Sequence, residues 1–393
     1  MGTHSRPSVY LISGSRTAQG SLMGALSDIS APELGKVALQ GAIKKAKIDP
    51  QKIEQIYMGN VLQAGVGQAP ARQVAIKAGL SEATSAVTIN KVCGSGMMSV
   101  ILAAQQIQLG QARLVAAGGM ESMSQAPHFI PQGRAGLKFG TMNLMDSMLH
   151  DGLWDVYSQQ TMGSCAEICL QELKISREEQ DEFAMESFRR AQAAQASGFF
   201  AQEIEAVVKK TKKGEILIQD DEGPGKADFA KIPQLRPVFD AKGSITAANA
   251  STINDGASCI LLGDDSYQSQ GEFRLVSYAT HAQNPTWFTT APVEAMKKSL
   301  TMAGLKWGDI DQFEINEAFA MVTLAAIKEL KLDAKKVNPY GGAISLGHPI
   351  GSSGSRILVT LMNGMRNKSL RYGMASLCIG GGEGLSVIIE RVG

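Results

Sequence analysis

Four sequence patterns from the first third of the chain return in the last third, in the same order, and this repeat limits the possible folds more than any other feature. The segment that begins at Val9 resembles the one that begins at Phe273, since both are apolar, carry leucine and serine at matching places, and end in Ala-Gln. Residues 42–57 and 296–313 each contain an amphipathic helical pattern, a break and a short strand pattern. Such order is typical of a duplicated folding unit.

The other two matches add a strand, a glycine-rich turn and a helix, followed by another strand. Residues 87–107 and 337–365 share the first arrangement, with a longer turn in the second copy. Residues 113–119 and 374–381 are short apolar runs that end in glycines, which is typical of buried strands. We therefore predict two homologous α/β halves, each with a mixed sheet that helices cover on both faces.

The region between the two halves has a different character. The halves cover about residues 1–120 and 270–393, whereas residues 121–250 are rich in methionine, glycine and proline near their start. A helix is predicted over residues 176–196, because Ser176-Arg-Glu-Glu forms a capping box at its start. We interpret this region as an insertion in the first half, whose long loops are expected to contact substrate.

Composition excludes several classes of protein. Hydrophobic residues make up 44% and charged residues 19% of the 393 residues, which favours a large buried core, an oligomer, or both. The formal charge is only +1, so we expect no nucleic acid and no anionic membrane surface as a partner. No apolar run approaches the roughly 18 residues that a membrane span requires.

Cysteine usage and the chain ends favour the cytoplasm. The number of cysteines is odd and no CxxC is present, so neither a disulfide framework nor a zinc site is expected, and no other metal site is indicated. Residues 1–7 contain no apolar stretch of a signal peptide, and residues 391–393 are not a peroxisomal signal. We predict a soluble cytoplasmic protein. The cysteines are Cys93, Cys165, Cys169, Cys259 and Cys378.

Cys93 is a candidate nucleophile. It lies between a predicted strand and a predicted helix, in Lys-Val-Cys-Gly-Ser-Gly, so its sulfur is expected near the free N–H groups of a helix start. Such a place lowers the pKa of a thiol from about 8.5 and favours the reactive thiolate. The same amides could bind an oxyanion. A buried, inert cysteine at a strand end is the alternative.

His348 is a candidate acid or base. It stands in Gly-His-Pro-Ile-Gly, where glycines on both sides permit sharp turns and could aim the side chain into a site. An exposed loop histidine is the alternative. However, His348 occupies about the same place in the second half as Cys93 does in the first.

Two further residues follow strands of the second half. Cys378 precedes a run of glycines whose amides could form an anion-binding nest, and it could equally be a buried thiol before a tight turn. Asn316 follows the strand at residues 312–315 and could hold a water or cap the next helix. Because the halves are related by pseudo-symmetry, the ends of corresponding strands should converge on a shared centre.

Together these motifs resemble those of the thiolase family, and the resemblance extends over essentially the whole chain. The motifs also occur in family order. They are Val92-Cys93-Gly94-Ser95-Gly96, Gly118-Gly119-Met120-Glu121-Ser122-Met123, Asn316-Glu317-Ala318-Phe319-Ala320, Gly347-His348-Pro349-Ile350-Gly351 and Cys378-Ile379-Gly380-Gly381-Gly382.

The resemblance implies a fold and an assembly. Thiolases have a five-layer α/β/α/β/α fold of two pseudo-symmetric halves with a loop domain inserted in the first half, usually as a homotetramer. For this chain we expect an N-terminal half over residues 1–270, containing a loop domain at about 121–250, and a C-terminal half over residues 271–393.

The resemblance also implies the reaction and its residues. Two acetyl-CoA molecules would be joined reversibly to acetoacetyl-CoA and CoA through an acetyl group on Cys93, which His348 activates. Cys378 would exchange a proton with the second substrate, and Asn316 would position a water beside His348. Backbone N–H groups of Cys93 and Gly380 would hold one oxyanion, and His348 with the water the other. No metal or redox cofactor is required, because the coenzyme A thioesters are substrates.

Residues expected at the coenzyme A site follow from the same resemblance. One departure is Gln160-Thr161, where short-chain members often have histidine before Met-Gly. Trp287 and Phe288 are bulky near the expected acyl pocket and would favour a short chain if they point inward. The expected contacts are Leu153, Met162, Ala247, Ser251, Ala318 and Phe319, with Lys226 as a phosphate partner.

Three other functions remain open. A degradative 3-ketoacyl-CoA thiolase of broader chain length is the nearest one. A decarboxylating ketosynthase is disfavoured, because Cys378 stands where those enzymes have a second histidine. A catalytically silent protein that binds acyl-CoA is disfavoured by the intact Cys93, His348 and Cys378.

Overall fold

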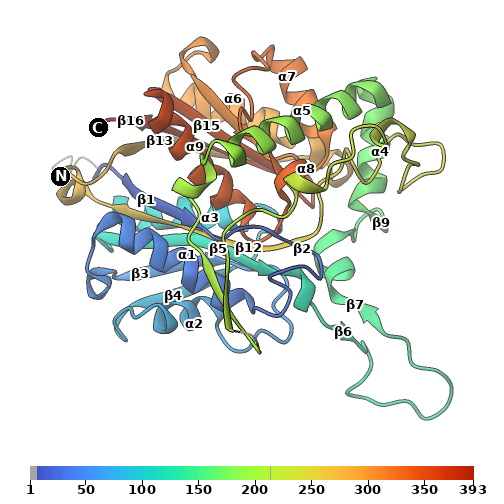
Figure 1. Ribbon diagram of the computed structural model, residues 1–393, viewed down its shortest axis with the longest axis horizontal. Coiled ribbons are helices and arrows are strands. Elements are labelled where there is room, and N and C mark those ends of the chain that lie inside the picture. The colour runs from blue at the N-terminus through green and yellow to red at the C-terminus, as the bar shows by residue number, and fades with distance from the viewer. Residues whose placement is uncertain (1–6, 213) are drawn as a thin grey trace.

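The strands of both halves join in one hydrogen-bonded path in the computed structural model, which describes residues 7–212 and 214–393. Residues 1–6, which belong to the segment 1–7 without a signal-peptide pattern, lie outside these ranges. Figure 1 shows the first half in blue and cyan, the second half in orange and red, and the inserted region in green beside them.

The first half contributes five strands in the order β4, β3, β5, β12 and β1. β3 runs parallel to β4 and β5, whereas β12 is antiparallel to both β5 and β1. A two-residue strand, β2, pairs with β12. The bounds are β1 (Tyr10–Arg16), β2 (Gly20–Ser21), β3 (Gln55–Gly59), β4 (Ser85–Ile89), β5 (Leu114–Ser122) and β12 (Asn254–Gly263).

The second half repeats this order and these directions. β14 is parallel to β15, and β16 is antiparallel to both β15 and β13. Val337 forms an isolated parallel bridge to Phe313 of β14, in the place that β4 takes in the first half. The bounds are β13 (Phe273–Ala282), β14 (Gln312–Ile315), β15 (Tyr372–Ile379) and β16 (Glu383–Arg391).

Helices form three layers around the two sheets. α1 (Ala31–Ala46) and α2 (Pro70–Lys77) pack with the first sheet, and α6 (Ala291–Ala303) and α7 (Ala320–Leu330) pack with the second. α3 (Ser95–Gln108) and α9 (Ser353–Lys368) share one apolar cluster with strands of both sheets and therefore lie between them. The predicted five-layer α/β/α/β/α fold of two similar halves is confirmed. The sheets meet where Tyr10 pairs with Arg274 and Leu11 with Phe273.

The inserted region supplies two helices and an extended arm. α5 begins after Ser176 with the predicted capping box, in which Ser176 and Glu179 each bond the other's backbone N–H. The arm between β6 and β7 projects from the body at the lower right of Figure 1. The bounds are β6 (His128–Phe129), β7 (Met145–Asp146), the π-helix η3 (Met148–Leu153), β8 (Trp154–Asp155), β9 (Gln160–Thr161), α4 (Met162–Leu173), α5 (Arg177–Ala196), β10 (Val207–Thr211) and β11 (Gly214–Ile218).

Short helical turns connect the main elements. Over the described part of the chain, no helix combines the length and apolar character that crossing a membrane requires. The remaining elements are α8 (Ala343–Leu346) and the 3₁₀ helices η1 (Pro50–Lys52), η2 (Met123–Gln125), η4 (Phe200–Gln202), η5 (Pro224–Lys226), η6 (Ile232–Gln234), η7 (Asp265–Tyr267), η8 (Pro285–Thr290) and η9 (Trp307–Asp309).

Candidate functional site

Both halves and the inserted region line one mostly apolar cavity of about 330 Å³. Cys93 of the first half and His348 and Cys378 of the second all face it. The predicted convergence of the three reactive side chains is therefore present. Other predicted site residues that line this cavity are Gly380, Leu153, Met162, Ser251, Ala318 and Phe319.

The loop that presents Cys93 is a strained turn. Val92 has φ +45°, a left-handed conformation that is unfavourable for a β-branched residue. The side chain of Asn90 accepts a hydrogen bond from the Val92 N–H at 3.0 Å. Ser95 Oγ accepts from the Lys91 N–H at 2.8 Å and donates to the Val92 carbonyl at 2.7 Å. These bonds hold the thiol directly before α3.

The expected low pKa of the Cys93 thiol is wrong. Burial raises the pKa to about 11, and a hydrogen bond from the Gly380 N–H lowers it only in part. The negative charge of Glu121 adds a smaller upward contribution. Removal of water disfavours the thiolate more than nearby backbone N–H groups favour it. Cys93 is thus a neutral thiol at pH 7 and requires a base.

The first half holds the backbone of His348. The His348 N–H donates to the Thr252 carbonyl at 3.1 Å and to Asn254 Oδ1 at 3.3 Å. Gly347 has φ +107°, and a Cβ there would lie 2.2 Å from the Asn254 side chain, so only glycine permits this approach. The glycine before His348 thus has the role in the turn that the sequence suggested.

Hydrogen bonding fixes the tautomer of His348. The Ser353 hydroxyl has one proton and donates it to the Pro349 carbonyl at 2.9 Å. Its oxygen therefore accepts from Nδ1–H of His348, at 2.5 Å, which leaves Nε2 without a proton. Nε2 has no hydrogen-bond partner among the described residues. Burial, and next the positive charge of Arg356, lower the pKa of His348 to about 3, so the ring is neutral.

Cys378 and Gly380 come from the end of β15. Burial and next the proximity of Cys93 raise the pKa of the Cys378 thiol well above its usual value. This thiol is therefore also neutral at pH 7. Gly381 and Gly382 have φ +89° and +84°, which turns the chain sharply after Gly380.

Asn316 does not line the cavity. It is fully buried directly after β14, and its N–H donates to the Ser376 carbonyl at 2.9 Å. Neither polar atom of its side chain has a hydrogen-bond partner among the described residues. A buried amide without partners is costly and suits a bound water. The structure thus places Asn316 beside the lining residue Ala318 but not in the wall.

Glu121 ties the two halves together, a role that the sequence alone did not indicate. This buried carboxylate accepts hydrogen bonds from the backbone N–H groups of Val61, Leu62 and Gly351, at 2.9 to 3.1 Å. The side-chain amide of Asn60 donates to it at 2.7 Å. Burial raises the pKa of Glu121 to about 7, and the four hydrogen bonds oppose that rise. Glu121 thereby anchors the loop that follows His348.

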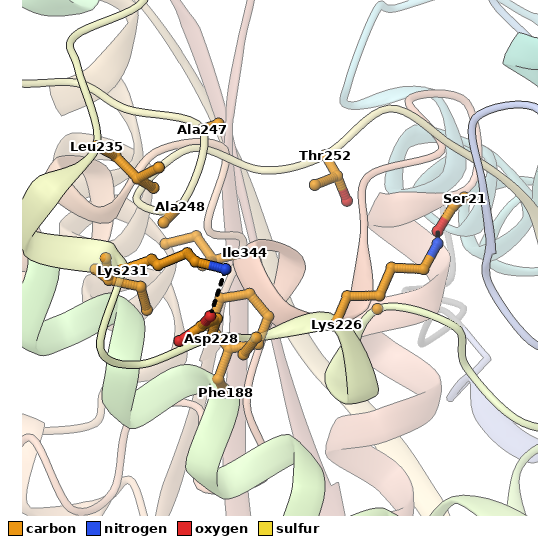
Figure 2. Close-up of a pocket in the computed structure, with 13 residues that line it drawn as sticks. Ser21, Phe188, Lys226, Asp228, Lys231, Leu235, Ala247, Ala248, Thr252 and Ile344 are labelled. Atoms are coloured by element: carbon orange, nitrogen blue, oxygen red, sulfur yellow. Dashed lines mark hydrogen bonds and ion pairs between the residues drawn. The ribbon is translucent and has the colours of Figure 1, made fainter.

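A second cavity of about 400 Å³ adjoins the first, since Thr252 lines both. Lys226 and Ala247, two predicted coenzyme A contacts, line this second cavity. Figure 2 shows Lys226 extending to Ser21, with Nζ to Oγ at 2.6 Å, and Lys231 turned toward Asp228, at 2.9 Å. The predicted contacts thus divide between two neighbouring cavities.

Several walls of the first cavity were not predicted. Phe288 of η8 lines the cavity and Trp287 does not, so only one of the two predicted bulky residues faces inward. Thr161, which replaces the expected histidine, lines the cavity and caps α4. Apolar loop residues have no periodic pattern that would reveal them. The others include Val92, Met123, Val238, Phe239 and Ile350.

Family models match almost the whole chain. The model described as "Thiolase, N-terminal domain" matches residues 9–266, and "Thiolase, C-terminal domain" matches residues 270–391. The relative "Acetyl-CoA acetyltransferase 1" of Arabidopsis thaliana is 46% identical over 97% of this chain and 94% of its own length. The "Acetyl-CoA acetyltransferase" of Cupriavidus necator is 45% identical over 98% of this chain and 99% of its own.

Solved structures resemble the fold closely. The human mitochondrial 3-ketoacyl-CoA thiolase superposes with a TM-score of 0.95 at 38% identity, covering 98% of this chain and 99% of that one. A thiolase from Ascaris suum in complex with coenzyme A gives a TM-score of 0.92 at 41% identity, covering 98% and 100%.

Proposed function

This chain belongs to the thiolase family, as its motifs predict, and on that premise we propose that it is an acetyl-CoA acetyltransferase. It joins two acetyl-CoA molecules to acetoacetyl-CoA and CoA and catalyses the reverse thiolysis. The observation that carries the proposal is the cavity in which Cys93, Cys378 and a neutral His348 meet. Relatives about 45% identical over nearly their full length bear the same activity in their names.

In the first half-reaction, Cys93 takes the acetyl group. His348 Nε2, which has a free lone pair, removes the thiol proton as the sulfur attacks the thioester carbonyl. The N–H groups of Cys93 and Gly380 bind the oxyanion that forms. Cys378 gives its proton to the departing CoA thiolate, so acetyl-Cys93, an imidazolium and a Cys378 thiolate remain.

In the second half-reaction, the Cys378 thiolate removes a proton from the methyl group of the next acetyl-CoA. Burial raises the pKa of Cys378, so its thiolate is a strong base once it has formed. The resulting enolate attacks acetyl-Cys93, and His348 returns its proton to the Cys93 sulfur. A water held by the unpartnered amide of Asn316, together with His348, stabilises the enolate oxygen.

Coenzyme A spans the two adjoining cavities in this proposal. Its thioester end lies in the first cavity, and its nucleotide end lies in the second. Lys226 and Lys231 bring positive charge to the second cavity, which matches the phosphates of coenzyme A. The coenzyme A bound to the Ascaris suum thiolase supports this ligand. The proposed contacts are Leu153, Met162, Lys226, Ala247, Ser251, Ala318 and Phe319.

A 3-ketoacyl-CoA thiolase of broader chain length is the second candidate. The high structural similarity to the human mitochondrial 3-ketoacyl-CoA thiolase favours it. Against it stand three aromatic side chains, since Phe239, Phe288 and Phe319 all line the cavity and leave limited space for a longer chain.

Thiolysis of 3-ketoacyl-CoA substrates of different length tests the proposal. We expect kcat/KM for acetoacetyl-CoA to exceed that for an eight-carbon substrate by about tenfold or more. Phe288→Ala should raise the rate with the longer substrate, whereas Trp287→Ala, next to it but outside the wall, should not. A higher kcat/KM for the longer substrate in the unchanged protein would support the second candidate. Absence of any turnover would contradict both.

We also propose a homotetramer. The arm between β6 and β7 exposes Leu137, Phe139 and Leu144, of which Phe139 is 96% exposed, and solvent alone does not favour such a surface. β4 is an edge strand with Val87 exposed, so it offers a further surface for pairing. Light scattering should give four times the chain mass. A monomeric mass would contradict the assembly.

A cytoplasmic location and a division at residue 270 complete the proposal. The five cysteines are all free, which suits a reducing compartment. Two relatives carry "mitochondrial" in their names, so cell fractionation decides between the compartments.

The N-terminal half would comprise residues 1–270, with the loop domain at about 121–250, and the C-terminal half residues 271–393. The matched ranges 9–266 and 270–391 support this division.

A further inference from the structure

An ion pair outside the cavity wall joins the two loops that supply the proposed oxyanion donors. Lys91 Nζ lies 2.5 Å from Glu383 Oε2, although the two residues are 292 positions apart in the chain. Their side chains are only 23% and 35% exposed. Such an ion pair in reduced contact with water is stronger and more rigid than a fully exposed one.

Lys91 belongs to the strained turn of the first half. It lies two residues before Cys93, and its N–H is bonded to Ser95 Oγ. The next residue, Val92, has the left-handed conformation described above. A strained turn persists only when surrounding contacts hold it in place. The Lys91 side chain adds a contact from this turn to the second half.

Glu383 belongs to the glycine turn of the second half. It is the first residue of β16 and pairs with Ile379, so it closes the turn that contains Gly380, Gly381 and Gly382. These glycines have no side chains that could anchor the turn. The Gly382 carbonyl accepts a hydrogen bond from the Gln283 N–H at 2.9 Å, and Glu383 adds a second anchor on the side of Lys91.

We propose that Lys91 and Glu383 are positioning residues that hold the Cys93 and Gly380 N–H groups at the spacing that the oxyanion requires. Neither side chain lines the cavity, so neither contacts the substrate. Their contribution depends on the rigidity of two backbone donors, which matters most when charge develops on the carbonyl oxygen. The proposal rests on the proposed function and adds two residues to it.

Five variants and a control test the ion pair. Lys91→Met and Glu383→Gln each remove one charge, and a combined variant carries both changes. Lys91→Arg retains the charge, and a double variant, Lys91→Glu with Glu383→Lys, exchanges the charges. The control is Lys328→Met, which breaks the pair with Glu179, 2.7 Å apart and 45% and 40% exposed. The readouts are kcat and KM for thiolysis of acetoacetyl-CoA, with thermal melting to establish that each variant is folded.

We expect Lys91→Met and Glu383→Gln to lower kcat by about tenfold with KM nearly unchanged, because donors aimed at the oxyanion act on the transition state. The variant that combines Lys91→Met with Glu383→Gln should lose no more kcat than either single variant, since both substitutions break the same contact. Lys91→Arg and the exchanged pair should recover most of the rate, and Lys328→Met should retain all of it.

Three results would overturn the proposal: a kcat equal to that of Lys328→Met, losses that multiply in the combined variant, or a loss confined to KM. If Lys91→Met does not fold, Glu383→Gln decides alone, because it preserves the size of the side chain. The activity of the unchanged protein distinguishes a failure of the proposed function from a failure of the positioning role. If it does not cleave acetoacetyl-CoA, the proposed function fails; if it does and the variants are equally active, only the positioning role fails.

Discussion

The two halves build the same strand, loop and helix, yet the loop is short in the first half and long in the second. Residues 90–94 connect β4 to α3, whereas residues 338–352 connect Val337 to α9 and include α8. Bonds within its own turn hold the short loop. The long loop depends on Asn254 and Glu121 of the first half.

This difference shows how a duplicated scaffold acquires two chemical roles. The turn of the nucleophile Cys93 is held mainly by bonds within itself, with one ion pair from Lys91 to the second half. The first half positions the base His348. The His348 N–H donates to Thr252 and Asn254, and the Glu121 carboxylate accepts from the Gly351 N–H. Damage to the first half should therefore disturb both groups, and damage to the loop of His348 should leave the nucleophile in place.

The largest expected effect comes from removing the nucleophile of the first half. Cys93→Ser should lower kcat by about 10⁴-fold or more, because a hydroxyl is a far weaker acyl carrier than a thiol. Melting temperature should stay close to that of the unchanged protein, since one atom differs. Cys165→Ala, a thiol outside the cavity wall, is the control. Full activity of Cys93→Ser would mean that the nucleophile is misassigned.

Removing the base of the second half should cost less. His348→Ala should lower kcat by about 10²- to 10⁴-fold, the usual range for a general base. Because the bonds that hold the turn around Cys93 do not involve the loop of His348, this variant should still react with iodoacetamide at Cys93 at alkaline pH, where the thiolate forms without a base. Loss of both this reactivity and the activity would show that the position of Cys93 also depends on the loop of His348.

The next effect is on stability and comes from Glu121, whose hydrogen bonds join the two halves. Glu121→Gln places an NH₂ group against backbone N–H donors, so we expect the free energy of unfolding to fall by about 2 to 3 kcal/mol. Denaturant titration measures this loss. Glu329→Gln, which affects an ion pair about half exposed, serves as the control and should change little. Equal stability of the two variants would show that Glu121 does not anchor the loop that follows His348.

The mildest change is one of pH alone, and it concerns the protonation of the first-half thiol. Its pKa is raised to about 11, so the thiolate fraction rises as pH rises throughout the neutral range. The alkylation rate of Cys93 should therefore increase about tenfold per pH unit from pH 6 to 9. Peptide mass spectrometry at each pH measures it. A plateau in the alkylation rate above pH 7 would show that the thiolate is already formed. The pKa of Cys93 would then be low, as its place before a helix predicted.

The fold and the reactive residues could be predicted because both depend on chain order. Matching strands in the two halves indicated which loops converge, and Cys93, His348 and Cys378 stand at those loops. The pKa of Cys93 could not be predicted, because it depends on burial by walls that the inserted region supplies. Those walls are apolar loop residues such as Phe239, which carry no periodic pattern.

Contacts between residues far apart in the chain could not be predicted from the sequence either. Phe288 faces the cavity and its neighbour Trp287 does not, and a short 3₁₀ turn gives no pattern that distinguishes them. Lys91 and Glu383 are 292 positions apart, and only the folded chain places them together. Asn316 was identified by its motif, yet its position behind the wall depends on how β14 ends.

Mass spectrometry after incubation with acetyl-CoA tests the central claim most directly. The protein would be mixed with acetyl-CoA, quenched in acid and digested, with Cys93→Ser treated in parallel. We predict one acetyl group on the peptide that contains Cys93 and none in the variant. An acetyl group on Cys378 instead, or an unmodified Cys93 in protein that turns over, would contradict the account.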